Sequence, residues 1–180
     1  KEVLLGNYNG FPLENHTVFK GLSDYLGEDA TVSYEQGCKF FKGKRGLLKK
    51  AVKLAENSDV AVVCLGLDAS YEGEEGDANN PYCAGDRKTI EIIDAQLELL
   101  KAVKEVNENV ILLMFCGGAV AFGEAKDLSN AILNCWYPGE MGGKAIAQLL
   151  FGEYSPSGKL PVTIYSSTKD LPDFNDYSMK

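Results

Sequence analysis

Short apolar runs of strand length alternate with segments of helical periodicity along most of this chain of 180 residues. This alternation is typical of βαβ units, in which successive strands lie parallel in one sheet and the helices cover it. Six runs have the composition of strands: Glu2–Tyr8, Thr31–Gly37, Val60–Gly66, Asn109–Gly118, Asn130–Gly139 and Leu160–Tyr165. Five segments have helical character: Thr17–Gly27, Gly46–Asp59, Thr89–Asn107, Ala119–Leu128 and Gly142–Tyr154. The sequence therefore predicts an α/β fold with a mostly parallel sheet.

The run Val60–Gly66, VAVVCLG, is apolar at every position and so has no wet face. A strand of this kind is expected in the middle of a parallel sheet with helices on both sides. In Gly46–Asp59, by contrast, apolar residues recur at helical spacing and the lysines fall on the opposite face, which predicts an amphipathic helix over that sheet.

Charge and length limit what the chain can bind. It carries 26 acidic and 18 basic residues, a net charge of −8, so its field repels nucleic-acid phosphates and anionic lipid surfaces. An apolar content of 45% over 180 residues is enough for one well-buried domain. We therefore expect a single domain and neither nucleic acid nor a membrane as a partner.

No apolar run approaches the roughly 20 residues of a membrane span, and the first residues do not resemble a signal peptide. Because the chain begins at Lys1, we interpret it as a fragment of a longer protein. Its five cysteines are widely spaced and His16 is its one histidine, so no metal site is expected. The free cysteines and the acidic surface favour a reducing cytoplasm over secretion.

The most unusual polar stretch is Gly66–Asp77, GLDASYEGEEGD, which directly follows the central strand. Two more glycine-rich stretches, CGGAVAFG and YPGEMGG, follow the next two strand candidates. Ligands of open α/β sheets bind beyond the carboxyl ends of the parallel strands, where such loops meet. We therefore expect the three stretches to share one site or interface.

Taken alone, the acidic stretch allows two interpretations. It is either a solvated acidic surface, as most acidic runs are, or a loop that presents a carboxyl group to a substrate, with Tyr71 beside it. Close carboxylates oppose one another's ionisation, so one of them can retain a proton and act as an acid. Nucleotide binding, a flavodoxin-like alternative, is disfavoured because neither G-x-G-x-x-G nor a P-loop pattern occurs.

Motifs spread along the chain resemble the C-terminal domain of glycoside hydrolase family 3. AIAQLLFGEYSPSGKLPVTIY and the preceding CWYPGEMGG are similar to the segments that close this domain in the family. LLGNYNG, GLDASYEGEEGD and the terminal DFNDYSMK resemble segments of its β-xylosidase branch, in the same order.

The resemblance implies a three-layer α/β sandwich with six strands, five parallel and one antiparallel, and helices on both faces. It also implies exo-acting hydrolysis of β-linked sugars with retention of configuration and without a cofactor. In this family an Asp on an N-terminal (β/α)₈ barrel is the nucleophile, and that barrel is absent from this chain. The loop after a strand of the present domain usually carries the acid/base Glu, so the chain would hold half of the catalytic pair.

The family pattern E-x-E-G-x-D-R assigns the acid/base role to Glu74, with Glu75 and Glu72 as alternates. The match is imperfect, because Asp77 is followed by Ala78 and a Gly-Asp-Arg occurs only at Arg87. An insertion in the loop would account for this. The residues that the resemblance suggests for substrate binding or shaping of the site are Tyr71, Asp77 and Arg87.

The expected domain organisation is an α/β sandwich over residues 1–166 and an extended arm or linker toward a further domain over residues 167–180. The expected partners are a β-linked xylo- or gluco-oligosaccharide or an aryl glycoside, and the barrel of the same enzyme. A β-xylosidase is favoured, then a β-glucosidase, with arabinose also open as the sugar. The alternative from a different class is a non-catalytic structural or sugar-binding domain.

Overall fold

A computed structural model describes residues 4–6, 9–68, 71–72, 87–173 and 175–178 of the chain. Its sheet contains β1 (Ala61–Gly66), β2 (Val110–Phe115) and β3 (Ala131–Asn134), in the order β1-β2-β3. Both pairs are parallel, with Val63 opposite Leu112 and Leu113 opposite Leu133. The parallel sheet predicted from the alternation of strands and helices is thus confirmed.

The central strand is β2, which is buried on both faces. The expectation that Val60–Gly66 lies in the middle of the sheet is wrong for the described residues, because β1 stands at one end of the order β1-β2-β3. Leu112 and Leu113 are neighbours on opposite faces, and each is 0% exposed. Leu112 belongs to a large apolar cluster on one face, and Leu113 belongs to a smaller cluster on the other. A run without polar positions suits such a strand, since neither face meets water.

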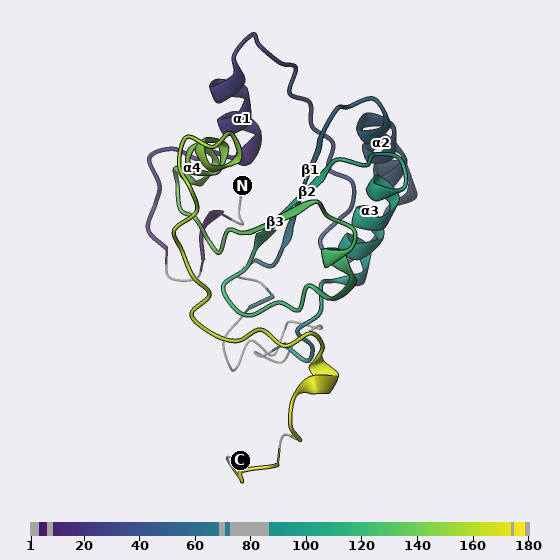
Figure 1. Cartoon of the computed structure of the whole chain (residues 1–180), viewed down its shortest axis with the longest axis vertical. Coiled ribbons are helices and arrows are strands. Elements are labelled where there is room, and N and C mark those ends of the chain that lie inside the picture. Colours follow the sequence, from purple (N-terminus) through teal and green to yellow (C-terminus); the bar gives the residue numbers. More distant parts are fainter. Residues whose placement is uncertain (1–3, 7–8, 69–70, 73–86, 174, 179–180) are drawn as a thin grey trace.

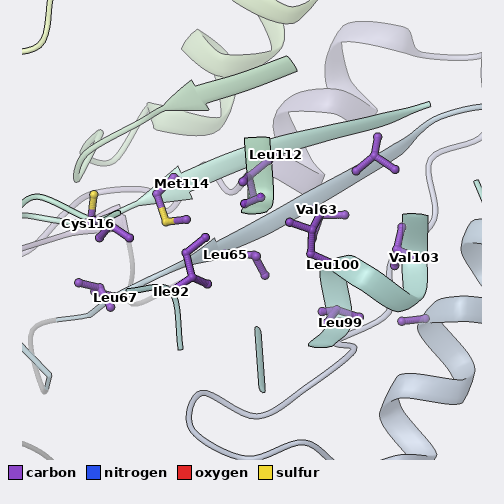
Figure 2. Packing of buried hydrophobic residues seen from close by; sticks show 14 of the residues in the cluster. Val63, Leu65, Leu67, Ile92, Leu99, Leu100, Val103, Leu112, Met114 and Cys116 are labelled. Carbon is purple, nitrogen blue, oxygen red and sulfur yellow. The ribbon is translucent and has the colours of Figure 1, made fainter. Parts of the chain in front are cut away.

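Helices α2 (Arg45–Glu56) and α3 (Asp94–Lys104) cover the face with the larger cluster. Figure 2 shows Leu99, Leu100 and Val103 of α3 facing the side chains of the sheet. Because α3 lies in the chain between β1 and β2, it forms the crossover that two parallel neighbours require.

Helices α1 (Val18–Leu26) and α4 (Gly142–Leu150) lie side by side on the opposite face (Figure 1). They approach closely at two glycines: a Cβ on Gly21 would lie 2.0 Å from the carbonyl oxygen of Gly143. The side chain of Thr17 caps α1 by accepting a hydrogen bond from the backbone N–H of Lys20. The three layers predicted from the sequence are therefore present.

The expectation of six strands, one of them antiparallel, is wrong for the described residues, which form three parallel strands. Thr31–Gly37 and Leu160–Tyr165 form no strand, and neither do residues 4–6 of the expected first strand. The segments Thr31–Gly37 and Leu160–Tyr165 are largely exposed to solvent; Leu160 is 54% exposed and Val162 is 53% exposed. Alternating composition favours a strand only where a neighbouring strand accepts its hydrogen bonds.

The helix expected over Thr89–Asn107 begins later, at Asp94. The residues before it make a parallel bridge between Glu91 and Ala121, in which the backbone N–H of Ala121 donates to the carbonyl of Ile90 at 2.7 Å. The segment Ala119–Leu128, also expected to be helical, contains only the 3₁₀ helix η2 (Gly123–Lys126). A local periodicity cannot reveal this pairing, because it joins two separate segments.

After α4 the chain contains one short element among its described residues, the 3₁₀ helix η3 (Thr168–Asp170). The C-terminal segment extends away from the sheet and its helices (Figure 1). It is attached at Glu91, which accepts hydrogen bonds from the hydroxyl of Ser167 and from Thr168. None of the described helices is long and apolar enough to cross a membrane.

Candidate functional site

The described parts of three loops meet at the carboxyl ends of the parallel strands. Glu72 follows β1, Gly117 and Gly118 follow β2, and Tyr137 follows β3. Parallel strands place these ends at one edge of the sheet, so residues far apart in the chain come within hydrogen-bonding distance. The predicted meeting of the three glycine-rich stretches is thus observed for the residues that the structure describes.

The Glu72 carboxylate is the centre of this meeting. Its Oε2 accepts the backbone N–H of Gly117 at 2.7 Å, and its Oε1 accepts the backbone N–H of Gly118 at 2.8 Å. The hydroxyl of Tyr137 donates to the same Oε2. Hydrogen bonds to a carboxylate are stronger than those between two neutral groups. Through these three bonds Glu72 joins the loops that follow all three strands.

The two glycines leave room for this contact. A Cβ on Gly117 would lie 2.7 Å from Cε2 of Tyr137 and 2.9 Å from Oε2 of Glu72. A Cβ on Gly118 would lie 3.2 Å from Oε1 of Glu72. Glycine at position 117 is therefore required by the close approach of the carboxylate and the aromatic ring.

Tyr137 is held as a proton donor. Burial raises the pKa of its phenol well above the ordinary value, and the hydrogen bond to Glu72 raises it further. The residue before it, Trp136, has a φ of 53°, in the left-handed region that bulky residues rarely adopt. This backbone turn directs the chain from β3 to the Tyr137 ring.

The end of β1 is fixed by a buried side chain of α3. The side-chain amide of Gln96, 5% exposed, accepts the backbone N–H of Gly66 and donates to the carbonyl of Gly66, both at 2.8 Å. The amide thereby replaces the strand neighbour that these two backbone groups would otherwise need. The acidic stretch thus starts from a fixed position.

Tyr71 lies just before Glu72, and the backbone N–H groups of both donate to the carbonyl of Asp68 at 3.0 Å. The Tyr71 residue is 9% exposed, and its ring packs edge-on against Phe41 at a centroid distance of 5.2 Å. Its position is therefore set by the large apolar cluster, to which it belongs.

Arg87 binds the same turn as Glu72. Its Nη2 donates to the carbonyl of Ala119 at 2.6 Å. Among the described residues its buried Nη1 has no hydrogen-bond partner. Glu72 and Arg87 lie 15 positions apart in the sequence, yet both contact the Gly117–Ala119 turn.

The candidate residues from the sequence fall into two groups. Glu72 and Arg87 come together at the turn after β2, and Tyr71 lies in the adjacent apolar cluster. Glu74, Glu75 and Asp77 lie outside the described residues. Tyr137 was missed as a site residue, although its stretch, YPGEMGG, was expected to share the site.

The hydrogen bonds of Glu72 limit its chemistry. Both of its oxygens accept from N–H groups, and a backbone N–H cannot accept a proton in return. Glu72 is therefore tied to the turn after β2 through both of its oxygens. In the described part of the chain, no group of three or more His, Cys, Asp or Glu residues is arranged to hold a metal.

Comparisons with known proteins agree with the resemblance noted in the sequence. Over 120 residues, 66% of the chain, it is 44% identical to a xylan 1,4-beta-xylosidase of Xylanibacter ruminicola, covering 14% of that protein. Over 91% of the chain it is 34% identical to the probable beta-D-xylosidase 7 of Arabidopsis thaliana, covering 20% of that protein. The chain thus spans a fifth or less of the length of these two relatives.

Solved structures share the fold. A β-glucosidase from Erythrobacter marinus matches 93% of the chain with a TM-score of 0.79 and 32% identity, and the match covers 25% of that protein. A GH3 β-glucosidase of Bifidobacterium adolescentis matches 96% of the chain with a TM-score of 0.77, also at 32% identity, and the match covers 24% of that protein. The family described as "Glycosyl hydrolase family 3 C-terminal domain" matches residues 1–180, and the chain therefore belongs to this family.

Proposed function

We propose that this chain is the C-terminal part of an exo-acting, retaining β-glycosidase and that it contributes the general acid/base to a shared active site. The nucleophile would be an Asp on an N-terminal (β/α)₈ barrel outside this chain. A β-xylosidase is favoured, since the two curated relatives described above carry xylosidase names. A β-glucosidase is the next candidate, because the solved structures are β-glucosidases.

One observation carries the proposal: a carboxylate of the acidic stretch, Glu72, is fixed at the carboxyl ends of all three strands. Enzymes with parallel α/β sheets bind ligands at this edge. The position of Glu72 at this edge supports a substrate site that includes the acidic stretch.

Within that stretch we assign the acid/base role to Glu74, with Glu75 as the alternate. The hydrogen bonds of Glu72 favour a different role for it, because both of its oxygens already accept from N–H groups. In a retaining enzyme the acid protonates the leaving oxygen and then, as a base, activates water, while the nucleophile lies about 5 Å away. Asp77 and Arg87 remain candidates for substrate contact or for shaping the site.

The test is Glu74→Gln in the longer enzyme that carries this chain. Without the acid, hydrolysis of xylobiose should fall by a factor of about 10² or more, in line with the usual contribution of general acid catalysis. Hydrolysis of a dinitrophenyl β-xyloside should be slowed less, because that leaving group needs little protonation. Added azide should restore turnover through a glycosyl azide product.

Glu75→Gln is the matched comparison, since it removes one carboxylate from the neighbouring position. Equal losses on both substrates in Glu74→Gln, without rescue by azide, would assign the role to another residue. The 180-residue chain alone should be inactive, because it carries at most one member of the catalytic pair.

A further inference from the structure

We infer that Glu72 is a positioning residue, which holds the start of the acidic loop on the Gly117–Gly118 turn and Tyr137 and thereby places the acid/base carboxylate. This inference rests on the proposed function, because it requires that the reactive carboxyl group belongs to the same loop. It assigns Glu72 a role different from proton transfer to the substrate.

The number and origin of the hydrogen-bond donors around Glu72 support a positioning role. Three groups from two other loops converge on the Glu72 carboxylate: the N–H of Gly117, the N–H of Gly118 and the hydroxyl of Tyr137. Two of them are backbone groups, and the third belongs to a partly buried ring. A side chain held in this way fixes its own backbone, and a solvated acidic surface would need no such set of partners.

The second support is the short distance along the chain. Glu74 is two positions after Glu72 in the sequence, and two residues span at most about 7 Å. Misplacement of a catalytic group by about 1 Å can cost roughly 10²-fold in rate. An anchor two residues from the acid/base is therefore well placed to affect turnover.

Arg87 makes a second attachment to the same turn, and this also supports the positioning role. Arg87 donates to the carbonyl of Ala119, next to the two glycines that bind Glu72. The residues that flank positions 73–86 thus both hold one three-residue turn at the end of β2. Glu72 supplies the attachment nearest to the acid/base.

The experiment compares Glu72→Gln with Glu74→Gln in the longer enzyme. A glutamine at position 72 keeps the size of the side chain but turns an NH₂ group toward one of the backbone donors. We expect kcat on xylobiose to fall by about 10- to 100-fold. The alkaline limb of the kcat/KM pH profile should persist and azide should give no rescue, because the acid/base itself is still present. Glu74→Gln should lose that limb and be rescued.

Tyr137→Phe is the second variant, for the case that Glu72→Gln folds poorly. It removes one of the three donors and leaves the carboxylate and both backbone N–H groups in place. A loss in kcat of about 5-fold is expected, roughly the effect of one hydrogen bond. In the double variant the two losses should not multiply, because both act on the same contact. Glu56→Gln at the exposed end of α2 is the matched control and should leave kcat unchanged.

Two results would overturn the inference. Loss of the alkaline limb with azide rescue in Glu72→Gln would make Glu72 the acid/base itself. An unchanged kcat in both Glu72→Gln and Tyr137→Phe, with only a lower melting temperature, would make the contact purely structural. If instead Glu74→Gln keeps the limb while Glu72→Gln is slow with its limb intact, the assignment of Glu74 fails and the positioning role stands.

Discussion

The Glu91 carboxylate holds Thr168 by two groups at once, accepting its backbone N–H at 2.7 Å and its hydroxyl at 2.6 Å. The two residues are 77 positions apart, and the contact joins the segment before α3 to the C-terminal tail. Thr168 in turn accepts the backbone N–H of Ile90 at 3.0 Å. The tail is therefore attached at a defined point although most of its residues are exposed.

This attachment should weaken in acid. The hydrogen bonds from the hydroxyl and then the backbone N–H of Thr168 lower the pKa of Glu91 from about 4.5 to about 2. Because the pKa of Glu91 is lower in the folded state than in the unfolded chain, the ionised carboxylate stabilises the folded state. This contribution to the free energy of unfolding is complete above about pH 4.5 and is lost as the pH falls toward 2. Glu91→Gln should reduce the free energy of unfolding at pH 7 by about 1 kcal/mol, since solvent screens this part-exposed group.

Trypsin offers a local measurement of the same contact, because Lys169 lies directly after Thr168. Glu91→Gln should speed cleavage at Lys169 at pH 7, as followed by mass spectrometry. Glu98→Gln, on the exposed side of α3, is the matched control and should leave the cleavage rate unchanged. Equal rates in all three proteins would show that Glu91 does not retain the tail.

Alanine at the contact between α1 and α4 should be strongly destabilising. A Cβ on Gly143 would lie 1.9 Å from the carbonyl oxygen of Thr17, so the helices would have to separate. We expect Gly143→Ala to lower the free energy of unfolding by about 3 kcal/mol in urea titrations. Gly46→Ala is the control: a Cβ at Gly46 of α2 meets no atom within 4 Å and should stabilise the protein by about 0.5–1 kcal/mol.

Gln96→Leu should leave the N–H and the carbonyl of Gly66, at the end of β1, without their side-chain partner. The substitution keeps the volume of the side chain but removes the amide that bonds both the N–H and the carbonyl of Gly66. A loss of about 3 kcal/mol in the free energy of unfolding is expected, because buried backbone groups without partners are costly. Trp136, the one tryptophan in the chain, provides the fluorescence signal for the titration. A loss below about 0.5 kcal/mol would contradict this account.

Gly117→Ala should act on the site more than on the fold. The added Cβ would displace the Tyr137 ring and the Glu72 carboxylate, both of which lie at the edge of the sheet. We expect a shift in Trp136 fluorescence, since Trp136 precedes Tyr137, and in the longer enzyme a loss in kcat comparable to that of Glu72→Gln. Gly158→Ala, where a Cβ meets no atom within 4 Å, should change neither signal.

The sequence predicted those elements whose determinants are local. The helical character of Thr17–Gly27, the amphipathic pattern of Gly46–Asp59 and the apolar run of Val60–Gly66 each predict an element, and the structure confirms them as α1, α2 and β1. The meeting of the loops after β1, β2 and β3 was also predictable, since the carboxyl ends of parallel strands share one edge. The family pattern named Glu74 first, which lies outside the described residues. It gave Glu72 only as an alternate acid/base and Arg87 as a candidate for shaping the site, and the structure brings these two to one turn.

The rest depends on partners far away in the chain. Thr31–Gly37 has the alternation of a strand, but no hydrogen-bonding strand beside it is present among the described residues. Tyr137 became a site residue only through its hydrogen bond to Glu72, 65 positions away. A local pattern of residue types shows neither whether a neighbouring strand is present nor which distant residue will accept a hydrogen bond.

The shared turn at Gly117–Ala119 has a consequence for protein engineering. Because Glu72 and Arg87 hold the same short turn, the two residues that flank positions 73–86 are both attached to the end of β2. The entropic cost of closing a loop grows only slowly with its length. A change in the number of residues between these two attachments should therefore cost the domain little stability.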